Sequence, residues 1–235
     1  MRTLAALAVI LPGIVAAACT ALVTRDRRRA FNRATELWGA WGIRAAGIEL
    51  RVVGAQFLKL RPAVFVINHQ SGVDPILVCA LLRRDFVGVA KAEIRRNPVL
   101  GPAFAWAGTI FLDREDSPAA RRSLERGLET LAKGYGVAIA PEGARSWGSR
   151  PGRFKSGAFR LALEARVPIV PIVIHDAGRI LPRGGFVMRA GRVHVSVQPP
   201  IATSDWTPEE VGSQVRSVEK LFEAIIRVRA AEGAA

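Results

Sequence analysis

The sequence predicts an α/β fold: a single domain with a largely parallel central sheet flanked by helices, plus an N-terminal membrane-anchoring helical segment. Two observations predict it. From residue 48 onward, short β-branched and apolar runs alternate with helical patterns, which is typical of a parallel sheet covered by helices. Before that point the chain contains a long apolar stretch without charge. We therefore divide the chain into an anchor with an amphipathic helix, residues 1–47, and an α/β domain, residues 48–235.

The apolar stretch, residues 4–23, is as long as the ~20 residues that an α-helix needs to cross the hydrocarbon layer. Pro12 and Gly13 lie in its middle, so a re-entrant or interfacial anchor is an alternative to a spanning helix. A secretory signal is the other alternative. The order of charges favours an anchor, because the basic run RDRRR (25–29) follows the stretch and only Arg2 precedes it. The positive-inside rule then places the rest of the chain at the cytoplasmic face of the cell membrane.

Residues 30–47 are expected to form an amphipathic helix. Phe31, Trp38 and Trp41 fall close to helical spacing, and tryptophan suits the depth of the lipid headgroups. An ordinary helix that faces a protein core is the alternative. The formal net charge of +14 implies an anionic partner. No recognition helix, aromatic stacking motif or zinc module is present in the sequence, so we predict an anionic membrane and no nucleic acid.

Strands and helices are expected to alternate in the rest of the chain. The strands are predicted at 48–53, 63–67, 86–90, 109–112, 136–140, 169–174 and 193–198. The helices are predicted at 75–84, 98–107, 117–133, 156–165 and near 207–231. Thr207 can cap the last helix, and Pro208 can take its first position. Two basic segments, 146–155 and 182–185, are expected to be loops.

The cysteines and two of the histidines suggest no chemistry. Cys19 and Cys79 have no partner at a metal or redox spacing, which fits a reducing compartment without a disulfide framework. His175 and His194 are expected to be structural. No spacing of histidines and acids supports a metal site. The sequence predicts no metal and no bound cofactor.

The segment VINHQSGVDP (66–75) follows a buried-looking strand and carries a histidine and an aspartate. Asp74 precedes Pro75, which predicts that Asp74 caps the next helix and Pro75 begins it. In a continuous helix His69 and Asp74 would point about 140° apart. A turn at Gly72 instead allows the Asp74 carboxylate to accept from one imidazole nitrogen, which makes the other nitrogen a candidate general base.

With Asn68, His69 and Asp74 in the pattern N-H-x-x-x-x-D, the chain resembles the glycerolipid acyltransferase family, the 1-acyl-sn-glycerol-3-phosphate (lysophosphatidic acid) acyltransferases and their relatives. Further segments resemble the other blocks of this family in order: KAEIRRNPVLG (91–101), GTIFLDR (108–114), APEGARS (140–146) and VPIVPIVI (167–174). One departure is Ala144, which stands where the family usually has threonine. A hydroxyl contact from this position is therefore not available to the acceptor.

The resemblance implies transfer of a fatty acyl group from acyl-CoA or acyl-carrier protein, as co-substrate, to the hydroxyl of a lysophospholipid. The acceptor that it favours is 1-acylglycerol-3-phosphate, which gives phosphatidic acid; another lyso-lipid such as lyso-ornithine lipid is the alternative. His69 would be the general base and Asp74 would orient it. Arginine and lysine side chains would hold the acceptor phosphate. The implied substrate-binding residues are Asn68, Lys91, Arg114, Glu142, Gly143 and Arg145.

Two other functions are weighed against acyl transfer. The segment ARSWG (144–148) has the outline of the nucleophile elbow of a serine hydrolase, with Ser146 as nucleophile, but GSRPG follows where the elbow needs a helix. The other alternative is a basic membrane-surface binding protein without catalysis. A His69→Ala variant separates it from an enzyme, because a binding protein would keep its affinity and have no activity to lose.

Overall fold

The computed structural model describes residues 2–98, 100–112, 117–145, 151–182 and 184–232. Within them a seven-stranded sheet has the order β1-β7-β6-β2-β5-β3-β4. Neighbouring strands run parallel except β6 and β7, which are antiparallel. The strands are β1 (Ile48–Val53), β2 (Ala63–Ile67), β3 (Phe86–Lys91), β4 (Ile110–Leu112), β5 (Gly136–Ile139), β6 (Ile169–His175) and β7 (Gly191–Val197). The predicted largely parallel α/β sheet is confirmed.

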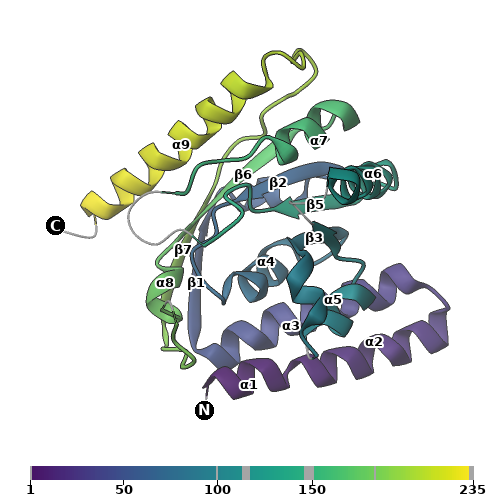
Figure 1. Cartoon of the computed structure of the whole chain (residues 1–235). Coiled ribbons are helices and arrows are strands. Elements are labelled where there is room, and N and C mark those ends of the chain that lie inside the picture. Colours follow the sequence, from purple (N-terminus) through teal and green to yellow (C-terminus); the bar gives the residue numbers. More distant parts are fainter. Residues whose placement is uncertain (1, 99, 113–116, 146–150, 183, 233–235) are drawn as a thin grey trace.

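Helices cover both faces of this sheet (Figure 1). One face carries α3 (Arg27–Ala46), α4 (Asp74–Leu82) and α5 (Leu100–Trp106), and the other carries α6 (Ser117–Ala132), α7 (Gly157–Ala165) and α9 (Val211–Glu232). Shorter elements, which the sequence pattern did not predict, are α8 (Ala177–Ile180) and the 3₁₀ turns η1 (Ala55–Lys59) and η2 (Ala92–Arg96).

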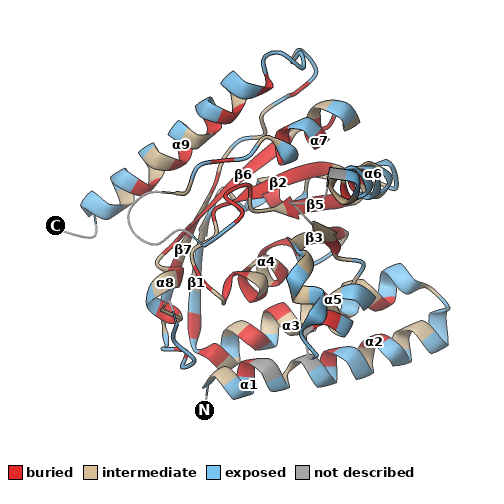
Figure 2. Cartoon of the chain, viewed as in Figure 1, coloured by how far each residue is buried: buried red, intermediate tan, exposed pale blue. Residues whose placement is uncertain are grey.

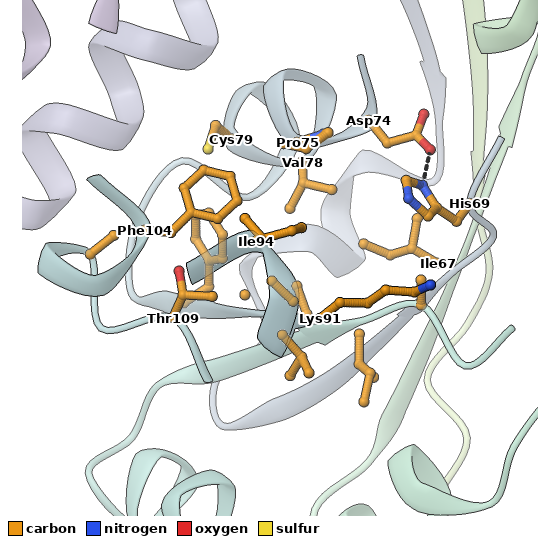
Figure 3. Close-up of a pocket in the computed structure, with 18 of the residues that line it drawn as sticks. Ile67, His69, Asp74, Pro75, Val78, Cys79, Lys91, Ile94, Phe104 and Thr109 are labelled. Carbon is orange, nitrogen blue, oxygen red and sulfur yellow. Dashed lines mark hydrogen bonds and ion pairs between the residues drawn. The ribbon is translucent and has the colours of Figure 1, made fainter. Parts of the chain in front are cut away.

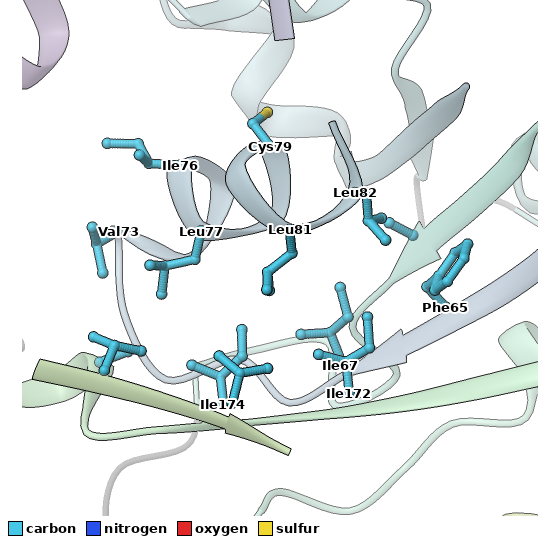
Figure 4. Close-up of a cluster of buried hydrophobic side chains, with 14 of the residues drawn as sticks. Phe65, Ile67, Val73, Ile76, Leu77, Cys79, Leu81, Leu82, Ile172 and Ile174 are labelled. Atoms are coloured by element: carbon cyan, nitrogen blue, oxygen red, sulfur yellow. The ribbon is translucent and has the colours of Figure 1, made fainter. Parts of the chain in front are cut away.

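The central strands β2 and β6 are buried on both faces, as Figure 2 shows. Their continuous apolar sequences suit this position, because helices exclude water from both sides of a parallel sheet. On one face, the side chains of α4 pack on β2 and β6, with Leu77 and Leu81 above Ile172 and Ile174 (Figure 4). The residues that follow β2 therefore emerge in the middle of the sheet, at its carboxyl edge, where α/β proteins place their ligand sites.

The start of the last helix differs from the prediction. Thr207 and Pro208 do not cap and begin it, because α9 starts at Val211. The carboxylate of Glu210 accepts from the Thr207 N–H at 3.1 Å, and the Glu210 N–H donates to the Thr207 carbonyl at 3.1 Å. These two bonds close a separate turn before the helix.

The apolar N-terminal stretch forms two helices, α1 (Arg2–Ala8) and α2 (Ile10–Thr24). Together they are long and apolar enough to cross a membrane, with a mean hydropathy of 2.4. The break lies at Val9 and not at Pro12 itself, because a proline removes the hydrogen bond to the carbonyl four residues earlier, here that of Ala8, and crowds that carbonyl. After α2 the chain turns back, and α3 packs along α2 (Figure 1).

The helix α3 packs closely on α4 through its small residues. A Cβ atom built on Gly39 would lie 2.5 Å from the backbone nitrogen of Ala80, so only glycine permits this approach. Of the two tryptophans in α3, Trp38 contacts Phe104 of α5, whereas Trp41 is 44 % exposed. One face of α3 therefore packs against the protein core, as the alternative to a headgroup-facing helix predicted.

Charged contacts also fasten α3 to the turn between α4 and β3. The Asp85 carboxylate accepts from Arg28 Nε at 2.7 Å and from Asn32 Nδ2 at 2.8 Å. Next to it, Arg84 Nε donates to Glu36 Oε1 at 2.6 Å. Burial tends to raise the pKa of Asp85, but the bonds from Arg28 and Asn32 outweigh it and lower that pKa. The division of the chain at residue 47 stays a prediction, and α3 packs across it.

Candidate active site

The turn between β2 and α4 brings His69 and Asp74 together, as their spacing predicted. His69 Nδ1 lies 2.5 Å from Asp74 Oδ2 (Figure 3). The same oxygen accepts from the backbone N–H groups of Gln70 at 2.9 Å and Ser71 at 3.0 Å. Asp74 is only 4 % exposed, so three donors compensate the burial of its charge. The backbone of the turn therefore fixes the Asp74 carboxylate, and the carboxylate in turn binds the His69 imidazole.

The prediction that Asp74 caps the helix is wrong. The helix α4 begins at Asp74, the cap position belongs to Val73, and no side chain caps the helix there. The carboxylate reaches back to the preceding turn because three donors converge on that side, whereas a cap offers only the N–H groups of its own helix. Asp74 is still an acidic residue in the first helical turn, where the helix dipole favours negative charge.

Two buried side chains fix the backbone on either side of the histidine. The Asn68 amide donates to the Ile174 carbonyl at 2.9 Å and accepts from the Ile174 N–H at 2.7 Å. Glu142 Oε1 accepts from the His69 N–H at 2.7 Å, and Oε2 accepts from the Gly152 N–H at 2.6 Å. His69 is thus tied to β6 and to the segment after β5. Both predicted substrate-binding residues face inward and hold the protein backbone.

Three other predicted residues gather around this turn. The Arg145 guanidinium lies over Gly72, since a Cβ atom built there would be 3.7 Å from Arg145 Nη2. Gly143 has a φ of 77°, a left-handed conformation that suits glycine. Lys91, at the end of β3, extends its side chain along the cavity toward His69 (Figure 3). Arg114 lies outside the described residues, as does Ser146.

These side chains line one end of a cavity of about 680 Å³. The rest of its wall is apolar and comes from helices far apart in the sequence. Examples are Ile14 of α2, Trp38 of α3, Val78 of α4 and Phe104 of α5. Figure 3 shows the labelled part of this wall, with His69 at the polar end. The cavity therefore joins a charged mouth to a long apolar interior, which suits a molecule with a polar head and a hydrocarbon chain.

Sequence reasoning missed this wall. Residues 30–47 were expected at headgroup depth, but Phe31 and Trp38 line the cavity. Lys155, which comes just before α7, also lines it. The patterns in α2, α3 and α5 predict an apolar face for each helix, but not which faces meet.

Other titratable residues have structural surroundings. Burial raises the pKa of Cys79, which lines the cavity, to about 12, so it remains a thiol. His175 is buried with its Nε2 3.2 Å from Ser196 Oγ. His194 lies 3.5 Å from Asp176. No group of three or more histidine, cysteine, aspartate or glutamate side chains that could hold a metal is found in the part of the chain that the structure describes.

Comparison with known proteins agrees with this geometry. Residues 49–175 match a family model described as Acyltransferase. The chain is 32 % identical over 177 residues to the 1-acyl-sn-glycerol-3-phosphate acyltransferase of Limnanthes alba, covering 75 % of this chain and 63 % of that one. It is 34 % identical over 190 residues to the alpha enzyme of the same name from Mus musculus, covering 80 % and 67 %. The chain thus spans about 63 % of the length of the plant relative.

A solved structure shares the fold. The 1-acyl-sn-glycerophosphate (LPA) acyltransferase from Thermotoga maritima superposes with a TM-score of 0.73 at 23 % sequence identity. The match covers 97 % of this chain and 98 % of that one.

Proposed function

Because the chain belongs to the acyltransferase family, we propose that it transfers a fatty acyl group from acyl-CoA or acyl-carrier protein to a lysophospholipid hydroxyl. The proposed acceptor is 1-acylglycerol-3-phosphate and the product is phosphatidic acid. One observation carries the proposal: a histidine held by a buried carboxylate stands at the charged mouth of a large apolar cavity. The relatives named above bear the name of this reaction.

The proposed reaction uses His69 as general base. Asp74 binds Nδ1 at 2.5 Å, which favours the tautomer whose Nε2 can accept a proton. Nε2 takes the proton of the acceptor hydroxyl while the hydroxyl oxygen attacks the thioester carbonyl. The Asp74 carboxylate offsets the charge of the imidazolium that forms. The intermediate then collapses: an ester C–O bond has formed, the C–S bond breaks, and the leaving sulfur receives the proton from His69. A positioned base of this kind contributes ~10²–10⁴ in rate.

We propose that Lys91 and Arg145 hold the acceptor phosphate together with Arg114. Lys91 and Arg145 line the cavity, and Arg145 lies over the Gly72 turn, within reach of a ligand bound at His69. Guanidinium groups can hold a phosphate through two parallel hydrogen bonds, and lysine adds a compact charge. Replacing either residue should raise the KM for the acceptor more than it lowers kcat.

The remaining substrate-binding predictions become positioning roles. Asn68 and Glu142 engage their polar groups with the backbone of β6, His69 and Gly152, so we propose that they keep the His69 backbone in place. Gly143 shapes the turn that presents Arg145. The apolar interior of the cavity would receive the acyl chain, because its wall offers hydrophobic side chains along its length.

We place the protein at the cytoplasmic face of an anionic membrane. The segment α1–α2 supports this location, because only 19 % of its most apolar stretch of 18 residues is buried inside the structure. The charge order around the segment supports the cytoplasmic side. The proposed division of labour is an anchor, residues 1–47, and a catalytic domain, residues 48–235.

The test is an acyl-transfer assay on membranes that contain the protein. Labelled acyl-CoA or acyl-carrier protein would be offered with a panel of acceptors: 1-acylglycerol-3-phosphate, other lysophospholipids and lyso-ornithine lipid. We expect transfer to 1-acylglycerol-3-phosphate that His69→Ala abolishes. The matched control is Ser146→Ala, which should keep the transfer. If no acceptor in the panel shows His69-dependent transfer, the proposal fails; loss of activity with Ser146→Ala in a folded protein would favour a hydrolase.

A further inference from the structure

The loop between α8 and β7 presents two large apolar side chains to solvent. Phe186 is 87 % exposed, more than any other large hydrophobic residue in the described part of the chain, and Val187 beside it is 66 % exposed. Gly184, with a φ of 68°, and Gly185 precede them and turn the chain at the tip. Exposed aromatic residues of this kind mark interaction sites when they form part of a larger apolar surface.

This loop is fastened beside the N-terminal helix. The Met188 N–H donates to Thr3 Oγ1 of α1 at 2.8 Å. The Gly191 N–H donates to the Gly47 carbonyl at 3.1 Å, and Ala190 packs so closely that a Cβ atom on Gly47 would lie 2.9 Å from its side chain. The position of the loop relative to α1 is therefore set by hydrogen bonds and packing.

The outer side of α1 and α2 forms an apolar surface next to this loop. Leu11, Val15 and Leu22 follow one another at spacings of four and seven residues, which places them on one side of α2. They are 68, 60 and 79 % exposed, and Leu4 of α1 is 72 % exposed. Figures 1 and 2 show the loop and the exposed side of these helices along the same edge of the molecule. The apolar surface of the helices thus continues onto the loop.

We propose that Phe186 and Val187 insert into the same lipid leaflet as the outer side of α1 and α2, as a second membrane contact. A tip of two side chains is too small for a stable protein interface, which buries roughly 1,200–2,000 Å², but it matches the depth of the boundary between headgroups and acyl chains. The exposed residues Arg2 and Arg189 lie near the base of the loop, where they suit anionic headgroups.

The same stretch of chain reaches the proposed active site. Ser71 Oγ donates to the Leu181 carbonyl at 2.8 Å, and the Leu181 side chain would lie 3.1 Å from a Cβ atom on Gly72. An inserted loop would therefore hold the turn that carries the catalytic pair close to the bilayer. This consequence depends on the proposed function, whereas the membrane contact itself does not.

The first experiment places an environment-sensitive fluorophore on Phe186→Cys in full-length protein that also carries Cys19→Ser. Cys79 is buried and will not react. Mixed with vesicles of phosphatidylcholine and phosphatidylglycerol, the probe should brighten several-fold and shift to the blue, and lipids with a nitroxide on the acyl chain should quench it. The matched control is Val228→Cys on α9, which is 60 % exposed before substitution and should show neither change. A probe at 186 that behaves like the one at 228 overturns the proposal.

The second experiment measures partitioning onto the same vesicles by sedimentation. Replacing Phe186 and Val187 together with serine should weaken partitioning about tenfold, equivalent to about 1.4 kcal/mol, whereas Val228→Ser should not change it. Unaltered thermal unfolding would show that the double variant folds. Unaltered partitioning in that folded variant overturns the proposal. Insertion of the loop in a protein without acyl-transfer activity would support the membrane contact and refute the proposed function. Acyl-transfer activity without insertion would support the proposed function and refute the membrane contact.

Discussion

The Asp74→Asn variant separates the proposed catalytic role of this side chain from its structural role. Asn has the same shape but no charge, and Asp74 Oδ2 now accepts three hydrogen bonds, from His69 Nδ1 and from two backbone N–H groups. The Asn amide oxygen can still accept the backbone bonds. Because the same oxygen faces His69 Nδ1, it keeps the imidazole tautomer but carries no charge to stabilise the imidazolium, so His69 becomes a weaker base.

The expected magnitudes follow from these bonds. A hydrogen bond to a charged group contributes about 1.5–3 kcal/mol and a neutral one about 0.5–1.5 kcal/mol. Each of the two backbone bonds to Asp74 should therefore weaken by about 1 kcal/mol, and the free energy of unfolding should fall by about 2 kcal/mol. The rate constant kcat should fall much further, by about 10²–10⁴, because a neutral amide does not stabilise the imidazolium that forms when His69 takes the proton.

The assay combines acyl transfer with denaturant unfolding of the same preparations. The matched control is Ser71→Ala, in the same buried turn: it removes the bond to the Leu181 carbonyl and should cost about 1–3 kcal/mol of stability with activity within a few-fold of the original. Our reasoning would be refuted if Asp74→Asn lost stability to this extent but kept its kcat. Asp74 would then serve only to hold the turn.

Three further predictions concern packing, the cavity and pH. Gly39→Ala should destabilise the protein by about 1–3 kcal/mol in thermal unfolding, because its Cβ would lie 2.5 Å from the Ala80 nitrogen. The control is Gly178→Ala, whose Cβ would have nothing within 4 Å. Equal destabilisation by the two substitutions would contradict the close approach of α3 to α4. Gly88 lines the cavity and a Cβ there meets nothing within 4 Å, so Gly88→Leu should shift donor preference toward shorter acyl chains, and an unchanged chain-length profile would place the acyl chain elsewhere. Burial lowers the pKa of His175 below its ordinary 6.5, so its contribution to stability is complete above that value and is lost as the pH falls toward the folded-state pKa; His175→Gln should flatten the fall in Tm between about pH 7 and pH 5, and an equal slope in both proteins would contradict this assignment.

Local patterns predicted most of the fold. The strands and the helices α4 to α7 lie within two residues of their expected bounds, because each depends on a run of neighbouring residues with one periodicity. The predictions failed where a short-range bond competed with the pattern. Glu210 closed a turn ahead of α9, and Pro12 moved the helix break to Val9. Neither effect changes hydrophobic periodicity.

The pairing of His69 with Asp74 is a property of the sequence alone, because His69, the turn and Asp74 lie within six consecutive residues and one local fold brings them together. What supports the pair was decided by tertiary structure. Glu142 binds the His69 N–H from 73 residues away, and the cavity wall combines α2, α3, α4 and α5. Local periodicity shows that each helix has an apolar face. Only packing of the whole chain determines which of these faces meet, and therefore how large a cavity remains beside the histidine.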